Sequence, residues 1–304
     1  MKIAAVIVTF NRLEKLKKAL SAYEAQVTPV DDLIVVDNCS TDGTDLFLKD
    51  WKNASGVSKR HVVYMEENLG GAGGFHDGCE YAMTLNPDWV FVADDDAYPD
   101  NELISRFKTF VEKNGADGIS AICGSVLDVN GNIAMHHRRT ITVEYLLRCR
   151  FHYSVLADYQ KECFAINQFS YVGTFMKVSS LRRVGLCNRE FFIYFDDGEH
   201  SLRMSKDGEI LCVPQLRIIH DDGFSTEKKN NGNNSPLWRS YYQIRNSIYT
   251  FLHHYPIVGL EKVFLIFITS VLLGKTSKEK KQMVKTAIKD AIFNKLGKHP
   301  TYRP

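Results

Sequence analysis

Short apolar runs alternate with stretches of helical periodicity in the first half of the chain. Each run is continuously apolar, which is typical of strands that are buried on both faces of a parallel sheet. The helix-length segments between them predict βαβ units, with helices covering the sheet. The expected strands are residues 3–8, 33–36, 61–65 and 89–93, and the expected helices are residues 13–23, 44–51, 73–83 and 101–112.

From residue 118 the regular alternation ends and strand-like pieces become more frequent, at residues 118–127, 169–178 and 210–213. This indicates the second half of one mixed-sheet domain. Residues 227–235, rich in Asn, Gly and Lys, predict a loop or linker, and the sequence beyond them is helical in pattern. We therefore expect an α/β domain over residues 1–226 and a helical region over residues 227–304.

Composition narrows the class of protein. With 304 residues, 44% of them hydrophobic and 24% charged, the chain can form one large domain with an appendage. A net charge of +2 gives no overall field that would favour nucleic acid. The seven cysteines include no CxxC pair and are odd in number, which fits a reducing compartment better than a disulfide framework or a zinc cluster.

Two apolar segments raise the question of a membrane. Residues 3–8 are too few for the core of a signal peptide and no small-residue cleavage site follows them. Residues 263–273 carry no charge, but they amount to about half of the roughly 20 residues that a spanning helix needs. We expect a protein that does not cross the bilayer, although it could touch it.

Polar clusters follow the four expected strands. Ligands of parallel α/β sheets bind beyond the carboxyl ends of the strands, so these clusters mark the expected binding edge. They are Thr9-Phe10-Asn11-Arg12, Asp37-Asn38-Cys39-Ser40, Asn68-Leu69-Gly70-Gly71 and Asp94-Asp95-Asp96.

The three consecutive carboxylates Asp94, Asp95 and Asp96 follow a buried strand. Adjacent carboxylates repel one another, and a divalent cation that neutralises them makes the cluster favourable. A helix N-cap is the alternative, since Asp is favoured at that position, but one Asp would be enough for it. The cluster therefore favours a metal-linked role.

The segment Asn68 to Phe75 has four glycines in five positions between a strand and a helix. Backbone N–H groups of such a segment can approach a diphosphate closely, and the helix N-terminus points at it. A tight structural turn would explain the same glycines. The spacing differs from GxGxxG, so a dinucleotide-binding fold is disfavoured. For Asp37, likewise, contact with a base or ribose and an Asx turn are both open and compatible.

A second acidic group, Asp196-Asp197-Gly198-Glu199, leads into an expected helix. Capping of that helix is one interpretation. A carboxylate placed in a cleft could instead act as a general base toward a hydroxyl group. His220 ends a further strand-like run and precedes Asp221, so it is a candidate metal ligand.

Taken in order, these motifs resemble those of the family 2 glycosyltransferases of the GT-A fold. The resemblance covers residues 1 to about 225. Within the family, the chain is most similar to bacterial galactofuranosyltransferases and related rhamnosyltransferases. This similarity lies in the glycine-rich segment followed by the three-Asp cluster, and in the later run Tyr241-Tyr242-Gln243-Ile244-Arg245-Asn246. The motifs are Val6 to Arg12, Val35 to Gly43, Asn68 to Phe75, Asp94 to Asp96, Gly173-Thr174-Phe175 and Asp196 to Glu199.

The resemblance implies an inverting transfer of a hexose from a nucleotide diphosphate sugar, with Mn²⁺ or Mg²⁺ as cofactor. It implies that Asp197 is the catalytic base; the family often has Glu where this chain has Asp196. The metal ligands would be Asp94, Asp96 and His220. The expected donor-binding residues are Thr9, Asn11, Arg12, Asp37, Asn38, Asn68, Gly70, Gly71, Gly73, Asp94 and Asp95, and the expected acceptor-binding residues are Gly173, Thr174, Asp196 and Glu199.

The resemblance also suggests the partners. UDP-galactofuranose is the first donor to consider and dTDP-rhamnose the second, with a glycan or lipid-linked glycan of a bacterial cell-surface polysaccharide as acceptor. A sugar-nucleotide nucleotidyltransferase is the alternative enzyme, but it would normally have a basic residue in the glycine-rich segment, and residues 68–75 have none. A non-catalytic carbohydrate-binding protein is the other alternative, and the presence together of Asp94, Asp96, Asp197 and His220 disfavours it.

Residues 275–298 contain eight Lys, one Glu and one Asp, a local charge of 8 − 2 = +6. Apolar residues at helical spacing lie between the lysines, which predicts a basic amphipathic helix. Such a helix could lie on an anionic membrane surface, making the protein cytoplasmic and peripheral to the membrane. It could equally pack its apolar stripe on the protein and leave its lysines in water.

Overall fold

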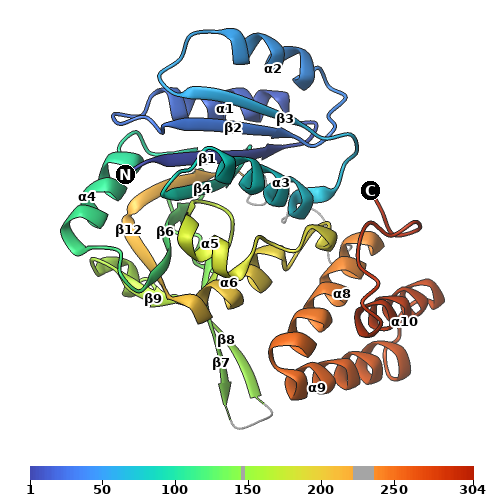
Figure 1. Ribbon diagram of the computed structural model, residues 1–304. Helices are drawn as coiled ribbons and strands as arrows, with labels where there is room; N and C mark the ends of the chain where they lie inside the picture. The colour runs from blue at the N-terminus through green and yellow to red at the C-terminus, as the bar shows by residue number, and fades with distance from the viewer. Residues whose placement is uncertain (145–147, 222–235) are drawn as a thin grey trace.

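The computed structural model describes residues 1–144, 148–221 and 236–304. Its centre is a mixed sheet in the order β3-β2-β1-β4-β11-β6-β12-β5, with β9 pairing to β12 (Figure 1). A small second sheet has the order β10-β7-β8. The strands are β1 Ile3–Thr9, β2 Asp32–Asp37, β3 Lys59–Tyr64, β4 Trp89–Asp94, β5 Ala97–Pro99, β6 Ile119–Leu127, β7 Arg138–Glu144, β8 Arg148–Tyr153, β9 Phe164–Ile166, β10 Gln168–Phe169, β11 Thr174–Lys177 and β12 Glu209–His220.

The first four strands are parallel, as the sequence predicts. Strand β11 then pairs antiparallel with both β4 and β6, which makes the sheet mixed. The helices are α1 Leu13–Glu24, α2 Thr44–Asn53, α3 Gly70–Thr84, α4 Leu103–Asn114, α5 Val178–Val184, α6 Asp196–Asp207, α8 Leu237–His254, α9 Pro256–Ile266, the π-helical turn η4 Phe267–Leu272, and α10 Lys278–Ile292.

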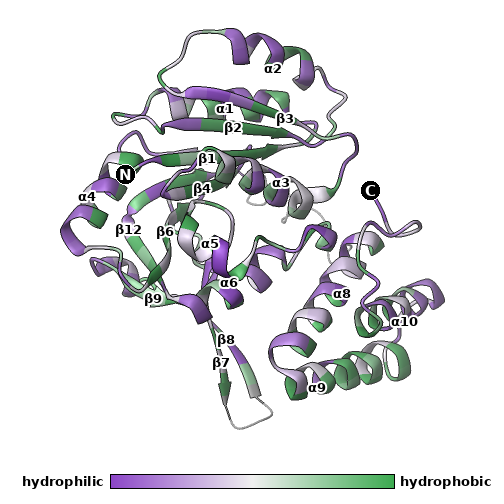
Figure 2. Cartoon of the chain, in the orientation of Figure 1, coloured by the Kyte–Doolittle hydropathy of each residue, from purple (hydrophilic) through white to green (hydrophobic). Residues whose placement is uncertain are grey.

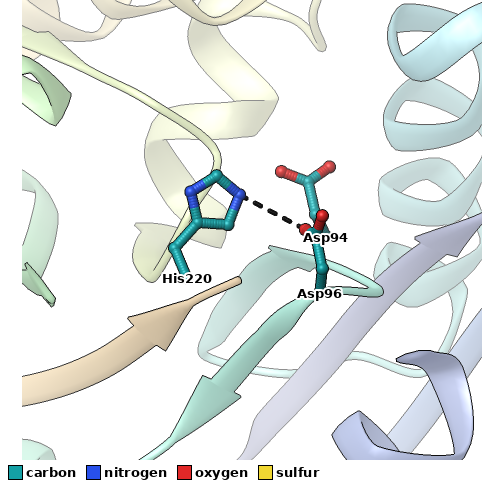
Figure 3. Close-up of side chains that lie close together, drawn as sticks. All are labelled: Asp94, Asp96 and His220. Atoms are coloured by element: carbon teal, nitrogen blue, oxygen red, sulfur yellow. Dashed lines mark ion pairs between the residues drawn. The ribbon is translucent and has the colours of Figure 1, made fainter. Parts of the chain in front are cut away.

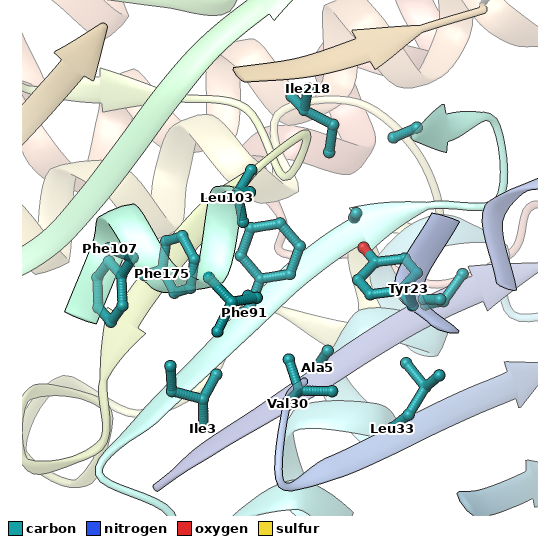
Figure 4. Close-up of a cluster of buried hydrophobic side chains, with 14 of the residues drawn as sticks. Ile3, Ala5, Tyr23, Val30, Leu33, Phe91, Leu103, Phe107, Phe175 and Ile218 are labelled. Carbon is teal, nitrogen blue, oxygen red and sulfur yellow. The ribbon is translucent and has the colours of Figure 1, made fainter. Parts of the chain in front are cut away.

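Alternate residues of β1 enter two separate cores, one on each face of the sheet. Ile3 and Ala5 face α1 and α4, where the rings of Phe107 and Phe175 stack with their centroids 3.7 Å apart (Figure 4). Val6 faces the opposite side, toward α3. Burial on both faces explains why the strand is continuously apolar.

Two sequence expectations need correction. Residues 169–178 do not form one strand: β10 ends at Phe169, β11 begins at Thr174, and α5 begins at Val178. The glycine-rich segment is not a loop ahead of a helix, because α3 already begins at Gly70. The glycines thus form the first turns of that helix, where close packing on neighbouring residues requires Gly70 and Gly74.

Helices α8, α9 and α10 form a separate lobe beside the sheet (Figure 1). The apolar stripe of α10 is buried against α8, with Met283, Val284 and Ala287 in the shared core. Most of the stripe of this helix therefore packs on the protein, as the second interpretation expects, and these buried residues are not available to a membrane. Ile292, at the end of the helix, is 48% exposed. No helix among the described residues combines the length and apolar composition that a membrane crossing requires.

The predicted linker at residues 227–235 and the predicted boundary after residue 226 lie outside the described residues. The division into residues 1–226 and 227–304 therefore stays a prediction.

Candidate active site

The metal-ligand candidates come together at the carboxyl end of β4. Asp94 is the last residue of that strand, and Asp96 follows in the turn to β5. Strand β12 pairs antiparallel with β5, which sets His220 opposite Ala97. As a result, ligand atoms of Asp94, Asp96 and His220 lie within 4.8 Å of one another, and His220 Nε2 is 3.2 Å from Asp96 Oδ1 (Figure 3).

The three carboxylates have different electrostatic environments. Burial, together with the charge of Asp96, raises the pKa of Asp94. Burial also raises the pKa of Asp95, to about 6, although Arg12 opposes the shift. Burial acts in the same direction on Asp96, but a hydrogen bond with His220 and the charge of Arg12 outweigh it, so the pKa of Asp96 is lowered. The site therefore holds more buried negative charge than its neighbouring cations balance.

These residues fit a divalent cation. Two carboxylates and one imidazole are oxygen and nitrogen donors suited to Mn²⁺, and carboxylate oxygens also suit Mg²⁺. Arg12 Nη1 lies 2.6 Å from Asp96 Oδ2. Its positive charge therefore neutralises part of the negative charge that a bound cation would otherwise balance. Among the described residues, Asp94, Asp96 and His220 are the one group of three or more acidic, His or Cys side chains with ligand atoms this close.

The expected donor-binding residues at the ends of β1 and β2 lie beside this site and are connected to it. Thr9 Oγ1 donates a hydrogen bond of 2.7 Å to Asp95 Oδ2. Asp37 Oδ1 accepts from the Ser40 N–H at 2.9 Å, which is the Asx turn. The Asn11 side chain accepts from the Thr41 N–H at 2.7 Å and joins the two loops.

Two asparagines connect β2 to the start of α3. Asn38 Nδ2 donates to Asn68 Oδ1 at 3.2 Å and to the Gly70 carbonyl at 2.9 Å. Asn68 Oδ1 also accepts from the Gly70 N–H at 2.8 Å. The two amide side chains thus fix the end of β2 against the first turn of α3.

The glycines at that turn have different tasks. Gly70 has φ +70°, and a Cβ there would lie 1.9 Å from the Phe192 carbonyl oxygen. A Cβ on Gly74 would lie 2.4 Å from Val8 Cγ1. Gly71, by contrast, has no such neighbour within 4 Å and lines the main cavity. Packing therefore accounts for Gly70 and Gly74, while Gly71 is the glycine that is open to a ligand.

The second acidic group begins α6 after a run of left-handed residues. Phe192, Tyr194 and Phe195 have φ values of 65°, 68° and 65°, an unfavourable conformation for large side chains that is often found at functional sites. Burial and the charge of Asp197 raise the pKa of Asp196 well above its usual range. Burial also raises the pKa of Asp197, although Arg139 opposes this.

The strained run is held by two buried residues of α8. Asn246 Nδ2 lies 2.9 Å from each of the carbonyl oxygens of Phe191 and Ile193 and 2.8 Å from that of Tyr194. Arg245 donates to the carbonyl oxygens of Glu190 and Phe191, each at 3.1 Å. Both residues belong to the run Tyr241 to Asn246, but the sequence did not indicate what they do. Their hydrogen-bond partners are backbone atoms that lie far away along the chain.

One cavity of about 760 Å³ connects the two acidic groups. Asp94 and His220 line it together with Asp196 and Asp197. Gln243, from the run Tyr241 to Asn246, also lines it, although the sequence indicated no role for it there. No local motif in the sequence marks several of its other polar residues: His137, Arg139, Ser170, Ser247 and Lys262. Of these, Arg139 has a buried Nε with no hydrogen-bond partner within the described part of the chain.

Three expected acceptor-binding residues lie outside the lining of this cavity. Gly173 has φ +74° and its carbonyl accepts from buried Arg138 at 3.3 Å. Thr174 Oγ1 donates to the Ser170 carbonyl at 2.8 Å. The Glu199 carboxylate is bound by Arg203 at 2.8 Å and by His254 at 3.0 Å, which joins α6 to α8. Each of these three residues thus makes contacts within the protein next to the cavity, and none of them lines it.

Known proteins are similar to this chain in sequence and in fold. Over 97 residues it is 38% identical to galactofuranosyltransferase GlfT1 of Mycolicibacterium smegmatis, which is 32% of this chain and 30% of that protein. Over 208 residues it is 27% identical to GlfT1 of Mycobacterium tuberculosis, 68% of this chain and 65% of that protein. The matches thus span less than two thirds of these relatives.

Among solved structures, TarS residues 1–349 of S. aureus in complex with UDP superimposes with a TM-score of 0.61 at 17% identity, covering 96% of this chain and 80% of that one. Mannosyltransferase PcManGT of Pyrobaculum calidifontis, in complex with GDP-Man and Mn²⁺, gives 0.56 at 14% identity over 98% of this chain and 76% of that one. The fold is the GT-A fold that the motifs predict. Residues 4–176, more than half of the chain, match the profile of Glycosyl transferase family 2, and the chain therefore belongs to that family.

Proposed function

We propose that this protein is a metal-dependent, inverting hexosyltransferase that uses a nucleoside diphosphate sugar. The observation that carries the proposal is the single cavity in which Asp94 and His220 lie with Asp197. A transferase of this kind needs stabilisation of a departing diphosphate and a base for the incoming hydroxyl, and the two acidic groups supply one each.

In the proposed reaction Asp197 takes the proton of an acceptor hydroxyl as its oxygen attacks the anomeric carbon. The bond from that carbon to the diphosphate oxygen breaks, and the nucleoside diphosphate leaves with the electron pair. One such displacement inverts the anomeric configuration. A cation held by Asp94, Asp96 and His220 would neutralise charge on the diphosphate.

Asp196 and Asp197 have different roles in this scheme. Adjacent buried carboxyls cannot both ionise easily, and the pKa of Asp196 is raised well above its usual range by burial and by Asp197. Asp196 therefore keeps the proton. Asp197 is ionised in the active form, since it faces Arg139 and accepts from the Gly198 N–H at 2.6 Å.

For the donor we propose UDP-galactofuranose first, because sequence relatives of this chain include galactofuranosyltransferases. We propose dTDP-rhamnose second, on the resemblance of the motifs alone. We propose a glycan or lipid-linked glycan of a cell-surface polysaccharide as acceptor. A nucleotidyltransferase is less well supported: Lys298 Nζ does reach the Asn68 carbonyl at 3.1 Å, but its Nζ contacts a backbone oxygen there and the segment itself has no basic residue.

The direct test is release of nucleoside diphosphate from a panel of sugar nucleotides with Mn²⁺ or Mg²⁺, compared between the natural chain and Asp197→Asn. Substitution removes the proton acceptor and keeps the shape, so turnover should fall roughly 10²-fold or more while donor affinity stays unchanged. Asp117→Asn, at an exposed loop position, is the matched control. Turnover near the natural rate in Asp197→Asn would remove Asp197 from the mechanism.

A further inference from the structure

The C-terminal lobe exposes an apolar stripe along α9 and η4. Ile257, Leu260, Phe264 and Phe267 recur at helical spacing, and Leu260 and Phe264 are 64% and 63% exposed. Leu272 and Leu273 extend the stripe beyond the helix. Figure 2 shows α9 as mostly hydrophobic along its length. An exposed apolar surface of this kind marks a contact with a partner or a membrane.

The opposite face of α9 is already packed, so its orientation is fixed. Val258 and Gly259 are buried against α8, and a Cβ on Gly259 would lie 2.6 Å from the Leu252 backbone nitrogen. Val271 is buried in the core shared with α8 and α10. The stripe therefore cannot rotate into the lobe, and it stays exposed while the helix holds its position.

Positive charge borders the stripe. Lys275, Lys278 and Lys280 follow it directly and are exposed. Because the apolar side of α10 is buried, Lys285 and Lys289 also remain at the surface of the same lobe. Exposed apolar side chains with flanking lysines suit the boundary between headgroups and acyl chains of an anionic bilayer.

We infer that the stripe of α9 and η4, residues 257–273, seats the protein on an anionic membrane surface, with the neighbouring lysines contacting lipid headgroups. This goes beyond the proposed transfer reaction and does not depend on it. It also differs from a membrane contact through α10, since the inserting residues belong to α9 and η4. Because no described helix can cross a bilayer, the contact is one of lying in the surface.

The face of α9 opposite the stripe borders the cavity of the candidate site. Lys262 and Ile266 of α9 line that cavity and also a second one of about 540 Å³, which β8 and α8 complete through Phe151 and Phe251. The hairpin of β7 and β8 projects on the same side of the molecule as α9 (Figure 1). The helix that carries the stripe therefore also forms part of the wall of the cavity that holds Asp197.

A second copy of the chain is a poorer occupant. In a two-fold dimer the same surface meets itself, so the lysines that border one stripe would come close to those of the other. Like charges at such a contact are unfavourable. An anionic bilayer meets both the apolar and the charged parts of this surface.

The test is flotation of the full chain with vesicles of phosphatidylcholine alone or mixed with phosphatidylglycerol, at two salt concentrations. The natural chain should bind the anionic vesicles, more weakly at high salt. Leu260→Asp and Phe264→Asp should each lower binding roughly tenfold or more, because each removes one apolar insertion. Leu46→Asp on α2 is the control: Leu46 is also 64% exposed and lies on the other lobe.

Melting temperature and nucleoside diphosphate release are measured on every variant. A variant that loses vesicle binding but keeps its melting temperature and its nucleoside diphosphate release supports the inference. If the proposed transfer reaction itself fails, the vesicle binding can still be compared between the variants. No binding by the natural chain would overturn the inference, as would equal binding by all variants. So would a dimer in solution that Leu260→Asp dissociates, since the stripe would then be an interface between copies.

Discussion

Asp96 is the residue on which the proposed metal site depends most. It lies between His220 and Arg12, and contacts that outweigh its burial lower its pKa. It therefore ionises more readily than Asp94 and Asp95, whose pKa values are raised. A diphosphate beside these carboxylates would be repelled unless a cation compensates their charge.

We predict that chelation of divalent metal lowers the affinity of the natural chain for the nucleoside diphosphate, and that Asp96→Asn lowers it with metal present. Calorimetry with Mn²⁺, with chelator and on both proteins measures this. Asp117→Asn should retain both the affinity and its dependence on metal. An affinity that chelator leaves unchanged would show that the metal assignment is wrong.

Arg139 controls the ionisation of the proposed base. Its positive charge lowers the pKa of Asp197 against the larger effect of burial, which raises it. Since a base must be deprotonated, turnover should increase as the pH passes upward through the raised pKa of Asp197. This acid limb should lie above the pH at which an exposed aspartate titrates.

We predict that Arg139→Gln moves the acid limb of the pH–rate profile to higher pH, because the neutral side chain no longer favours the ionised form. Profiles of kcat against pH for the natural chain and the variant measure the shift. Arg182→Gln, on exposed α5 surface, should leave the profile in place. A shift to lower pH would contradict the assignment of Asp197 as the base.

At the scale of elements, α3 owes its close approach to the sheet to glycines, among them Gly74 and Gly78. Gly74 packs on Val8 with no space for a methyl group, whereas Gly71, one turn earlier, faces the cavity. The two glycines share a helix but differ in what surrounds them. Gly74 is needed for packing on β1, whereas Gly71 leaves space for a ligand in the cavity.

We predict that Gly74→Ala costs about 1–3 kcal/mol of the free energy of unfolding, because the added methyl overpacks the contact with Val8. Gly71→Ala should instead be neutral or gain up to about 1 kcal/mol, since Ala favours the helix. Denaturant unfolding measures both. Donor affinity should fall in Gly71→Ala, whose methyl enters the cavity. Equal stability of the two variants would contradict the packing argument.

At the scale of the whole molecule, the C-terminal lobe supports the residues that we propose as catalytic. Asn246 and Arg245 hold the backbone that leads into Asp196 and Asp197, and Glu199 pairs with His254 across the same junction. The lobe is therefore part of the active site's framework, although it lies beyond the match to the family.

We predict that Asn246→Ala reduces turnover roughly ten- to hundredfold, because the strained segment shifts and misplaces Asp197. The loss of contacts to three carbonyls should also cost about 1–3 kcal/mol of stability. Donor affinity, measured by calorimetry, should change little, which distinguishes a positioning residue from a general loss of fold. Asn53→Ala, on the surface of α2, is the control. Unchanged turnover in Asn246→Ala would exclude the positioning role.

The local pattern of the sequence was sufficient for the parallel half of the sheet and for the acidic groups. Strands β1, β2 and β4 are largely apolar because both of their faces are buried, whereas β3, at the edge of the sheet, begins with Lys59 and Arg60 and is only partly buried. Polar residues follow where these strands end. The ordered motifs also predicted the family, which the profile match bears out. The break between β10 and β11 was missed, because an apolar run does not reveal where the backbone turns.

Tertiary structure decided which distant residues meet and what covers each apolar face. His220 reaches Asp96 only because β12 pairs with β5, and Arg139 enters the cavity from a second sheet. The sequence shows apolar residues in both α9 and α10. The apolar stripe of α10 packs on α8, however, while the apolar stripe of α9 stays exposed. The sequence determines that a face is apolar through its periodicity, but the burial of that face depends on the arrangement of the other helices.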